Sequence, residues 1–597
     1  MKVIMLMFDS LNRNFLPSYG NDWIKADNFT RLAEHAVQFQ NCYAGSLPCM
    51  PARRELHTGR YNFLHRSWGP LEPFDDSMPE LLKNNGIFTH LISDHHLYWA
   101  DGGATYHNRY STWEIIRGQE GDPWKGFVEK VEAPKDAKAP QRLFLPSREK
   151  LSDIWDQEWK NRQFFKKEED YPQSKTFDLG LKFIENNHEK ENWFLQIESF
   201  DPHEPFLVPE EYDKLYEDKI KKRNLDWPDY HPVTENEEDR DNLKYKYAAL
   251  LSKCDNSLGK VLDLMDKHKM WDNTMLIVCT DHGFLLGEHN WWAKNMMPAY
   301  NEIINTPLFI WDPRIGKKGE QRESLVQFID LAPTILEFFG ITPTKDMQGK
   351  ILKDTLESDQ KIRDFALIGW HGNQINCTDG RYVYMRGPET LENSPLFEYT
   401  LMPTHIKSRF SIDELKDAEF VKGFNFTKGC NVLKIPVKGF NQHFRFGTRL
   451  YDISKDPKQS NILKDYEIEK YMLQGMKKIM IESEAPIEQY ERVGIPLDSE
   501  ITTDDILKHH KKIKSYYALS DTLEKKVWEE QSKEEFFAFI NLMSTENRDE
   551  LIKIFEMEVE AKKTIHKAFV RNFIQNNVSE EKKSMVLYFL NLLSKRD

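Results

Sequence analysis

Short apolar runs that alternate with longer helical-looking stretches fill the first part of the chain, and this alternation constrains the fold more than any other feature. Between residue 1 and about residue 340 the clearest runs are residues 3–8, 88–93, 193–199 and 275–280. Alternation of this kind is typical of α/β proteins, in which helices cover both faces of a mostly parallel sheet. We therefore expect a large, mostly parallel sheet flanked by helices.

Polar residues with useful chemistry follow each of these four runs. Because the carboxyl ends of parallel strands meet at one edge of a sheet, and ligands of open α/β sheets bind there, we expect these side chains to surround one site. They are Asp9 after the first run, Asp94, His95 and His96 after the second, Asp201 and His203 after the third, and Asp281 and His282 after the fourth.

The composition of the chain changes twice, which predicts three regions. Between about 365 and 456 the segments become shorter and glycine-punctuated, and residues 379–384 have the pattern of a hairpin. The last glycine is Gly494 and the last proline is Pro496, so only helix-compatible residues follow. We expect an α/β catalytic domain at residues 1–364, a smaller antiparallel-sheet (α+β) subdomain at 365–470 and an all-helical C-terminal extension at 471–597.

Apolar residues in the extension recur every four positions, at 551, 555 and 559 and again at 565, 569 and 573. Such stripes bury against another helix or another copy of the chain. The tail is therefore expected to be a packing unit, with a homo-oligomer as one outcome.

Charge and cysteine content exclude several classes of protein. Lys and Arg number 82 against 96 Asp and Glu, a net charge of −14, which disfavours a general binder of nucleic acid or of an anionic membrane. Six cysteines without a CxxC pair are expected of a reducing compartment. The first apolar run, residues 3–8, is too short for a membrane span or a signal-peptide core, so the expected location is the cytoplasm.

Residues 46–60, SLPCMPARRELHTGR, form the segment with the strongest functional pattern. Pro51 suits the first turn of a helix and Gly59 its end, which places Cys49 at the N-terminal mouth, beside unpaired N–H groups and the positive end of the dipole. Arg53, one turn further, points back toward the same position with a planar cation that fits sulfate or phosphate oxygens. The segment predicts an anion site.

The order Cys49-x-Pro51-x-Arg53, followed by residues 58–60 (Thr-Gly-Arg), resembles the signature of the formylglycine-dependent sulfatases, in the alkaline-phosphatase superfamily. The resemblance covers about residues 1–456. It implies that a maturation enzyme oxidises Cys49 to formylglycine, whose hydrate attacks sulfur and later expels sulfate as the aldehyde re-forms.

A metal site is also implied by the resemblance. Asp9 and the pair Asp281-His282 occupy the positions of the family's metal ligands, with residue 49 as a further ligand. Hard oxygen ligands suit one divalent cation, with Ca²⁺ expected first and Mg²⁺ or Mn²⁺ as substitutes.

Three cationic residues match the family positions that face the scissile ester. His203 lies in a segment similar to the family's His-x-Pro-Phe, Lys294 in one similar to Gly-Glu-His-Gly-Leu-Trp-x-Lys, and His96 matches the His of Gly-Lys-Trp-His-Leu. With Arg53, Lys294 is implied to hold the sulfuryl oxygens, and His203 or His96 to protonate the leaving oxygen.

Two departures from the family pattern affect the metal and the leaving-group side. A single carboxylate, Asp9, precedes Ser10 where many members have two, and Asp94 replaces a sulfate-contacting Lys. Asp94 could bind the metal, orient His96 or accept hydrogen bonds from a hydroxyl-rich leaving group. The polar and aromatic residues 94–107 suit a sugar or an aryl group.

Hydrolysis of sulfate monoesters, on a small aryl or carbohydrate sulfate, is the expected function. The departures leave open a phosphonate monoester or phosphodiester hydrolase of the same superfamily. A third class is a non-catalytic anion-binding protein in which Cys49 stays a thiol. The expected partners are the small-molecule substrate and the maturation enzyme, without nucleic acid or membrane.

Overall fold

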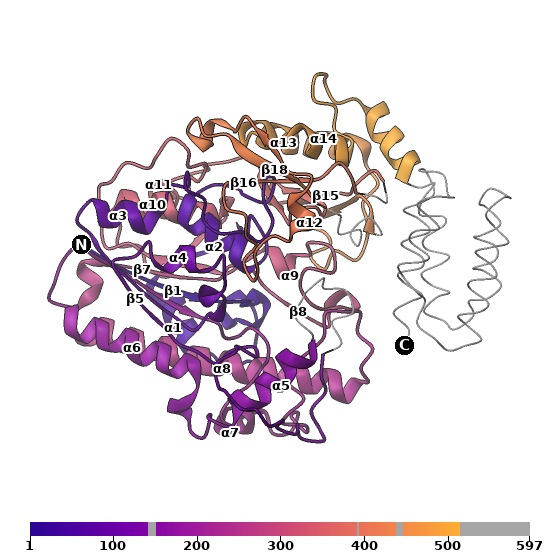
Figure 1. The fold of residues 1–597 in the computed structure, drawn as a ribbon. Coiled ribbons are helices and arrows are strands. Elements are labelled where there is room, and N and C mark those ends of the chain that lie inside the picture. Colours follow the sequence, from indigo (N-terminus) through magenta and orange to yellow (C-terminus); the bar gives the residue numbers. More distant parts are fainter. Residues whose placement is uncertain (141–150, 391–392, 438–445, 514–597) are drawn as a thin grey trace, which may run out of the picture.

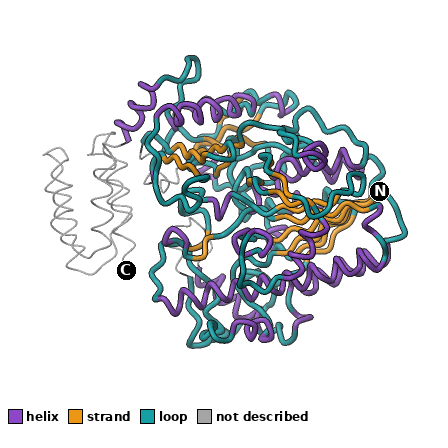
Figure 2. Tube along the Cα trace, turned by 180° about the vertical axis from the view of Figure 1, so that it is seen from behind, coloured by secondary structure: helices purple, strands orange, loops and turns teal. Residues whose placement is uncertain are grey.

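The structure, a computed structural model, describes residues 1–140, 151–390, 393–437 and 446–513. One large sheet lies between two helical layers, and a smaller region with its own strands is set against one end of this sandwich (Figure 1). Viewed from behind, the strands of the large sheet form one stacked layer, and the second group of strands lies apart from it (Figure 2).

Within the described residues, eight strands form the large sheet in the order β11-β2-β10-β7-β1-β6-β4-β5. The strands from β7 to β5 run parallel, whereas β10 is antiparallel to β7 and β2. The mostly parallel sheet is confirmed. Its strands are β1 (Lys2–Phe8), β2 (Val37–Phe39), β4 (Phe88–Ser93), β5 (Thr112–Ile115), β6 (Trp193–Ser199), β7 (Thr274–Cys279), β10 (Leu308–Trp311) and β11 (Gln321–Arg322).

Both faces of the sheet are covered, which explains why its central strands are apolar without alternation. Ile4, Leu6 and Phe8 of β1 pack into one core cluster, and the alternate residues of the same strand pack into the cluster on the other face. The first layer contains α1 (Asp27–His35), α6 (Pro172–Asn187) and α8 (Glu237–Lys267), and the second contains α2 (Cys49–Thr58), α3 (Met78–Asn84) and α10 (Leu331–Phe338).

The smaller region contains two antiparallel sheets. One has the order β13-β14-β15-β19, and the hairpin predicted at 379–384 joins its two middle strands; the other has the order β16-β18-β17. Their bounds are β13 (Ala366–Gly369), β14 (Ile375–Thr378), β15 (Tyr382–Arg386), β16 (Phe397–Thr400), β17 (Glu419–Val421), β18 (Val432–Pro436) and β19 (Arg449–Asp452).

Helix α13 (Tyr466–Glu482) packs on the first of these small sheets, and α14 (Ile487–Val493) follows it. The boundary expected at residue 471 falls inside α13. This helix packs with the small sheet, since Met472, Leu473 and Met476 share one buried cluster with residues of its strands. The apolar stripes at 551–573 lie outside the described residues, and the expected role of the tail in self-association remains a prediction.

The small sheet also fixes the segment that precedes Cys49. Gly369, at the end of β13, accepts a backbone hydrogen bond from Leu47 at 2.9 Å and donates one to Gly45 at 3.0 Å. Glu55 of α2 accepts from the backbone N–H of Ser46 at 2.5 Å. The start of α2 is thus held by both regions of the protein.

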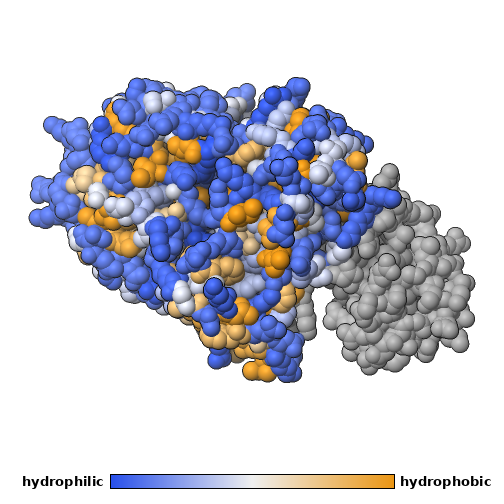
Figure 3. Space-filling model, turned by 90° about the horizontal axis from the view of Figure 1, so that it is seen from above, coloured by the Kyte–Doolittle hydropathy of each residue, from blue (hydrophilic) through white to orange (hydrophobic). Residues whose placement is uncertain are grey.

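The surface seen from above is mainly hydrophilic, with small separate hydrophobic groups (Figure 3). Among the described helices, none has the combination of length and apolarity that a membrane crossing requires.

Candidate active site

Cys49 is the first residue of α2, as the sequence predicts, and the helix ends at Gly59 with a left-handed φ of 60°. Its side chain is buried, with 3% of the residue exposed. Three polar side chains surround the sulfur: His282 Nε2 lies at 3.3 Å, Lys294 Nζ at 3.5 Å and Asp9 Oδ1 at 3.9 Å. Burial, together with the Asp9 carboxylate, raises the pKa of the Cys49 thiol well above its ordinary value.

The four residues expected to bind a metal come together. One possible ligand atom from each of Asp9, Cys49, Asp281 and His282 lies within 4.8 Å of the others, and all four residues are buried. They follow β1, begin α2 and follow β7, so the parallel register of adjacent strands β1 and β7 sets their spacing.

The tautomer of His282 suits metal coordination. Its Nδ1 lies 2.9 Å from the carbonyl oxygen of Gly283, which can only accept, so Nδ1 carries the proton. Nε2, which faces Cys49, then presents a lone pair. Two carboxylates and this nitrogen, buried together, are a donor set that fits one divalent cation.

Arg53 joins carboxylates from three strand regions. It donates to Asp9 at 2.9 Å, to Asp281 at 2.9 Å and to Glu198 of β6 at 2.7 Å. A further N–H donates to the Cys49 carbonyl oxygen at 2.9 Å. The guanidinium thus aligns the expected metal ligands, and four of its donor contacts are made within the protein.

Glu198 is a site residue that the sequence analysis missed. Besides Arg53, it accepts from the hydroxyl of Tyr98 at 2.9 Å and from Gln196 at 3.0 Å, and it is fully buried. The signal in the sequence is a carboxylate inside a mostly apolar run, since an unpaired charge there would be costly.

Lys294 is held toward Cys49 by Ser10. Its ammonium donates to Ser10 Oγ at 2.6 Å, and that hydroxyl donates to Asp9 Oδ1 at 2.8 Å. Burial alone would raise the pKa of Asp9, but Lys294 and Arg53 lower it well below its ordinary value. Ser10, which stands where many family members have a second carboxylate, therefore links the cation to the expected metal ligand.

His203 is oriented by Glu204. Its Nδ1 lies 2.6 Å from the Glu204 carbonyl oxygen and 3.1 Å from that residue's carboxylate, so Nε2 is the atom available on the other side of the ring. Burial and then the Lys294 ammonium lower the pKa of His203 to about 3. A bound anion would oppose both influences, because it adds negative charge beside the ring.

Of the two neighbouring histidines after β4, it is His95 that approaches the metal cluster. Its Nε2 lies 3.8 Å from Asp9 Oδ2, whereas His96 Nε2 lies 4.0 Å from Glu120 Oε2. The ring of Phe200 lies among three imidazoles, with centroid distances of 5.1 Å to His95, 5.8 Å to His96 and 4.1 Å to His203. His96 therefore lies toward the outer side of the site and His95 toward the metal ligands.

Asp94 holds Phe200, the ring that lies among the three histidines, in place through the Phe200 backbone. Its carboxylate accepts from the Phe200 N–H at 2.7 Å and from Gln119 at 2.9 Å, and Gln119 also donates to Asp201 at 3.0 Å. Burial and the nearby Asp201 raise the pKa of Asp94 to about 7. The structure places Asp94 outside the metal cluster, where it fixes Phe200 rather than contacting a metal ligand.

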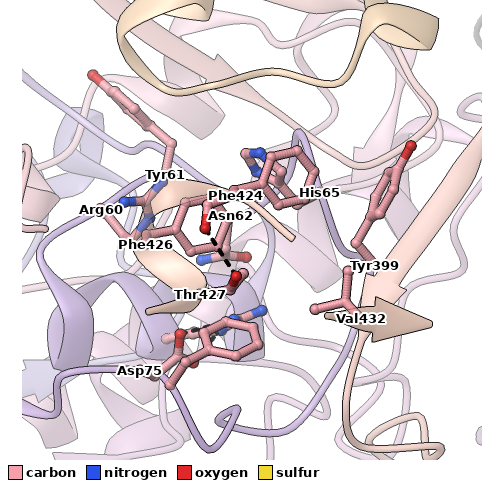
Figure 4. A pocket seen from close by; sticks show the side chains of 12 residues that line it. Arg60, Tyr61, Asn62, His65, Asp75, Tyr399, Phe424, Phe426, Thr427 and Val432 are labelled. Carbon is pink, nitrogen blue, oxygen red and sulfur yellow. Dashed lines mark hydrogen bonds and ion pairs between the residues drawn. The ribbon is translucent and has the colours of Figure 1, made fainter. Parts of the chain in front are cut away.

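A small pocket elsewhere, between the end of α2 and the second small sheet, is distinct from this cluster (Figure 4). There the guanidinium of Arg60 lies 3.7 Å from the ring centroid of Phe426. Its cavity of about 10 Å³ holds roughly one water molecule, too little for a substrate.

Comparison with known proteins agrees with the architecture. The family model described as Sulfatase matches residues 2–341. The N-acetylglucosamine-6-O-sulfatase of Bacteroides thetaiotaomicron is 25% identical over 411 residues, which cover 60% of this chain and 71% of that protein.

Two solved structures share the fold. One, a protein in complex with its substrate D-glucosamine-2-N,6-O-disulfate, has a TM-score of 0.56 at 17% identity and covers 81% of this chain and 98% of its own. The other, the phosphonate monoester hydrolase of Agrobacterium radiobacter, has a TM-score of 0.55 at 17% identity, with 82% and 96% covered. The fold is therefore common to enzymes that act on sulfur and on phosphorus esters.

Proposed function

Because the chain belongs to the sulfatase family, it hydrolyses sulfate monoesters, and we propose that it does so with residue 49, as formylglycine, beside one bound divalent metal. The observation that carries the proposal is the convergence on Cys49 Sγ of His282 at 3.3 Å and Lys294 at 3.5 Å, at the mouth of a helix. As formylglycine hydrate, residue 49 supplies an oxygen nucleophile for attack at sulfur, which a buried thiol does not.

Asp9, Asp281 and His282, together with residue 49, would hold the metal. We propose Ca²⁺, with Mg²⁺ or Mn²⁺ as the other candidates, since two of the donors are hard carboxylates. When bound, the cation supplies charge neutralisation for sulfuryl oxygens and for the nucleophile. Three carboxylates face two cationic side chains in the buried cluster, so a further positive charge is favoured there.

The remaining chemistry belongs to side chains already in place. Lys294, fixed by Ser10, faces the sulfuryl oxygens next to residue 49. His203, with Nδ1 bound to Glu204, presents Nε2 for protonation of the leaving oxygen, and His96 is the second candidate for that proton transfer. Arg53 fixes the positions of the Asp9 and Asp281 carboxylates rather than acting as the main sulfate ligand.

Peptide mass spectrometry around residue 49 tests the proposal, with protein expressed together with a formylglycine-generating enzyme. Active protein is expected to show loss of the thiol and the mass of the aldehyde or its hydrate. Cys49→Ser is the matched control. It keeps a small polar side chain, but the co-expressed enzyme cannot convert serine to formylglycine, so this variant is not expected to reach full activity. Full activity with unmodified cysteine would overturn the proposal and would leave residue 49 in an anion-binding role.

Phosphonate monoester or phosphodiester hydrolysis is the second candidate, favoured by the single carboxylate before Ser10 and by Asp94 in place of a lysine. Comparison of kcat/KM on an aryl sulfate, a monosaccharide sulfate, a phosphonate monoester and a phosphodiester decides between them. A preference for either phosphorus ester by more than about tenfold, or about 1.4 kcal/mol, would make the second candidate the main activity.

The cytoplasm is the proposed location. All six cysteines are free, and five of them are buried, which is the usage expected where thiols stay reduced. Cell fractionation with an antibody to the chain would test this, and recovery in a secreted fraction would contradict it.

A further inference from the structure

We propose a second metal site, for one Zn²⁺ or a similar transition-metal cation, formed by Glu185, His188 and His268 at the opposite edge of the large sheet from Cys49. One possible ligand atom from each of these three residues lies within 4.8 Å of the others. The site is independent of the proposed function, because the three residues are distinct from the catalytic cluster.

The three residues come from the C-terminal ends of two neighbouring helices. Glu185 lies in the last turn of α6, and His188 caps that helix with its N–H bonded to the Ile184 carbonyl oxygen at 2.8 Å. His268 caps α8 in the same way, through the Leu264 carbonyl oxygen at 3.0 Å. The two helices pack against each other on one face of the sheet (Figure 1), so their ends bring the three side chains together.

This position is far from the nucleophile. His188 lies next to the start of β1, since its carbonyl oxygen accepts from Lys2 Nζ at 2.6 Å. Asp9 follows the other end of the same strand. At about 3.3 Å per residue, the seven residues of β1 span about 23 Å, so the two metal sites lie at opposite edges of the sheet.

His188 is held in the tautomer that a metal ligand needs. Its Nδ1 lies 2.8 Å from the Glu185 carbonyl oxygen, which can only accept, so Nδ1 carries the proton and Nε2 the lone pair. A carbonyl bound to one ring nitrogen is the usual partner of a histidine that binds metal through the other nitrogen. Glu189 Oε1, on an exposed side chain 4.0 Å from Nε2, adds negative charge near the lone pair.

The contact between Glu185 and His268 is one that a cation can replace. Nε2 of His268 lies 2.9 Å from Glu185 Oε2, where the nitrogen donates to the carboxylate. When a cation binds these two atoms, the proton leaves Nε2 for Nδ1 of the same ring, which stays neutral. Lys267 pairs with the other oxygen, Oε1, at 2.6 Å, so Oε2 is the oxygen that faces the metal.

The two imidazoles are stacked, with ring centroids 3.7 Å apart and 29° between their planes. Two protonated rings at this distance would repel each other, whereas a shared cation uses both rings in the neutral form. Their side chains are 13% and 25% exposed, which restricts the rings and still leaves a path for an ion from solvent.

The donor set indicates which cation binds. Two imidazole nitrogens and one carboxylate suit Zn²⁺, with water in the fourth position of a tetrahedron, whereas Ca²⁺ prefers six or more oxygen ligands. A cation here would join the C-terminal ends of α6 and α8 and stabilise the folded state.

Calorimetric titration of the full-length, tag-free protein with Zn²⁺, in excess Ca²⁺, tests the site. Wild type is expected to bind Zn²⁺, and its thermal midpoint is expected to rise with Zn²⁺ concentration, because the cation binds the folded state. His188→Gln and His268→Gln are each expected to weaken this binding at least tenfold. His405→Gln is the matched control, since His405 also contacts a glutamate, Glu414, at 2.8 Å and is similarly exposed.

Asp281→Ala separates the two metal sites, because it alters the catalytic cluster and is expected to keep the Zn²⁺ binding that His188→Gln loses. Zn²⁺ binding that is lost in Asp281→Ala but kept in both histidine variants would assign the cation to the catalytic cluster and overturn the proposal. Absence of Zn²⁺ binding to wild type would overturn it too, and would leave the stacked pair as a surface contact. Glu185→Gln, which keeps the shape of the side chain, gives the same test if a histidine variant does not fold.

Discussion

Glu198 of β6 accepts a hydrogen bond from Nε of Arg53 on α2 at 2.7 Å, and both side chains are buried. The same guanidinium holds Asp9 and Asp281, so Glu198 supplies its counter-charge from the opposite side. Through this pair Glu198, which is not one of the four expected metal ligands, influences how the carboxylates of Asp9 and Asp281 are placed.

Glu198→Gln is predicted to weaken binding of the divalent cation about tenfold, because Arg53 loses one of its three anionic partners and bears more strongly on Asp9 and Asp281. Calorimetric titration of metal-stripped protein measures this. Glu114→Gln, on the half-exposed side chain of Glu114 in β5, serves as the control. Unchanged affinity in Glu198→Gln would show that the pair only stabilises the fold.

Asp281→Ala is predicted to abolish metal binding and turnover while the fold remains, because the residue lies after β7 rather than within the core strands. Elemental analysis and circular dichroism give the two readouts. Asp272→Ala, exposed in the turn before the same strand, should retain both metal and activity. Full metal occupancy in Asp281→Ala would remove this residue from the ligand set.

Ser10→Gly is predicted to lower kcat/KM about tenfold without lowering the thermal midpoint. The change removes the hydroxyl that positions Lys294, but glycine suits the φ of 63° that serine adopts there. Asn192→Gly, at an exposed residue with a similar φ of 61°, controls for the backbone effect. Equal activity in Ser10→Gly and wild type would exclude the hydroxyl from the positioning of Lys294.

Acid is predicted to destabilise the protein through buried histidines away from the metal cluster. Burial lowers the pKa of His57, His65 and His371 from 6.5 to about 3. Because the unfolded chain takes up protons that the folded chain excludes, their stabilising contribution is complete above pH 6.5 and is lost as the pH falls toward 3. Each histidine contributes up to about 1.4 kcal/mol per pH unit in that window.

Urea unfolding between pH 5 and pH 8 tests this slope, with His371→Gln expected to flatten it relative to wild type. A wild-type stability that does not change across this range would contradict the assignment.

Truncation after residue 513 is predicted to reduce the oligomeric mass in solution, since the apolar stripes at 551–573 need a partner surface. Light scattering of the full and truncated chains measures the mass, and activity assays run beside it. If both chains have the same mass and the same activity, residues 514–597 take no part in self-association or catalysis.

The sheet and the strand-end residues were predictable because both depend on short-range patterns. The apolar run before Asp9 and the run before Asp281 each had to be a buried parallel strand, and parallel strands place their ends together. The position of Cys49 followed from the Pro51 and Gly59 signals in the same way. The ends of a helix or strand, and the residues that lie there, can be derived from a few neighbouring residues.

Contacts that depend on loop conformation could not be derived in that manner. Choosing between His95 and His96 requires the direction of the chain after β4, which Asp94 sets by binding the Phe200 backbone 106 positions away. Glu120 likewise lies beside His96 and His203 only because its loop returns toward Asp94, to which Gln119 donates at 2.9 Å. Their partners are distant in sequence, so no local pattern identifies them.

The burial of Cys49 has a consequence for biosynthesis. With 3% of its surface accessible, enclosed by the ends of β1 and β7 and by Lys294, its sulfur lies beyond the reach of another protein's catalytic groups once the domain has closed. The proposed oxidation must therefore take place on the nascent or unfolded polypeptide. The yield of mature enzyme would then depend on the relative rates of Cys49 oxidation and of folding during synthesis. Chains that fold before oxidation would keep the Cys49 thiol and would be inactive.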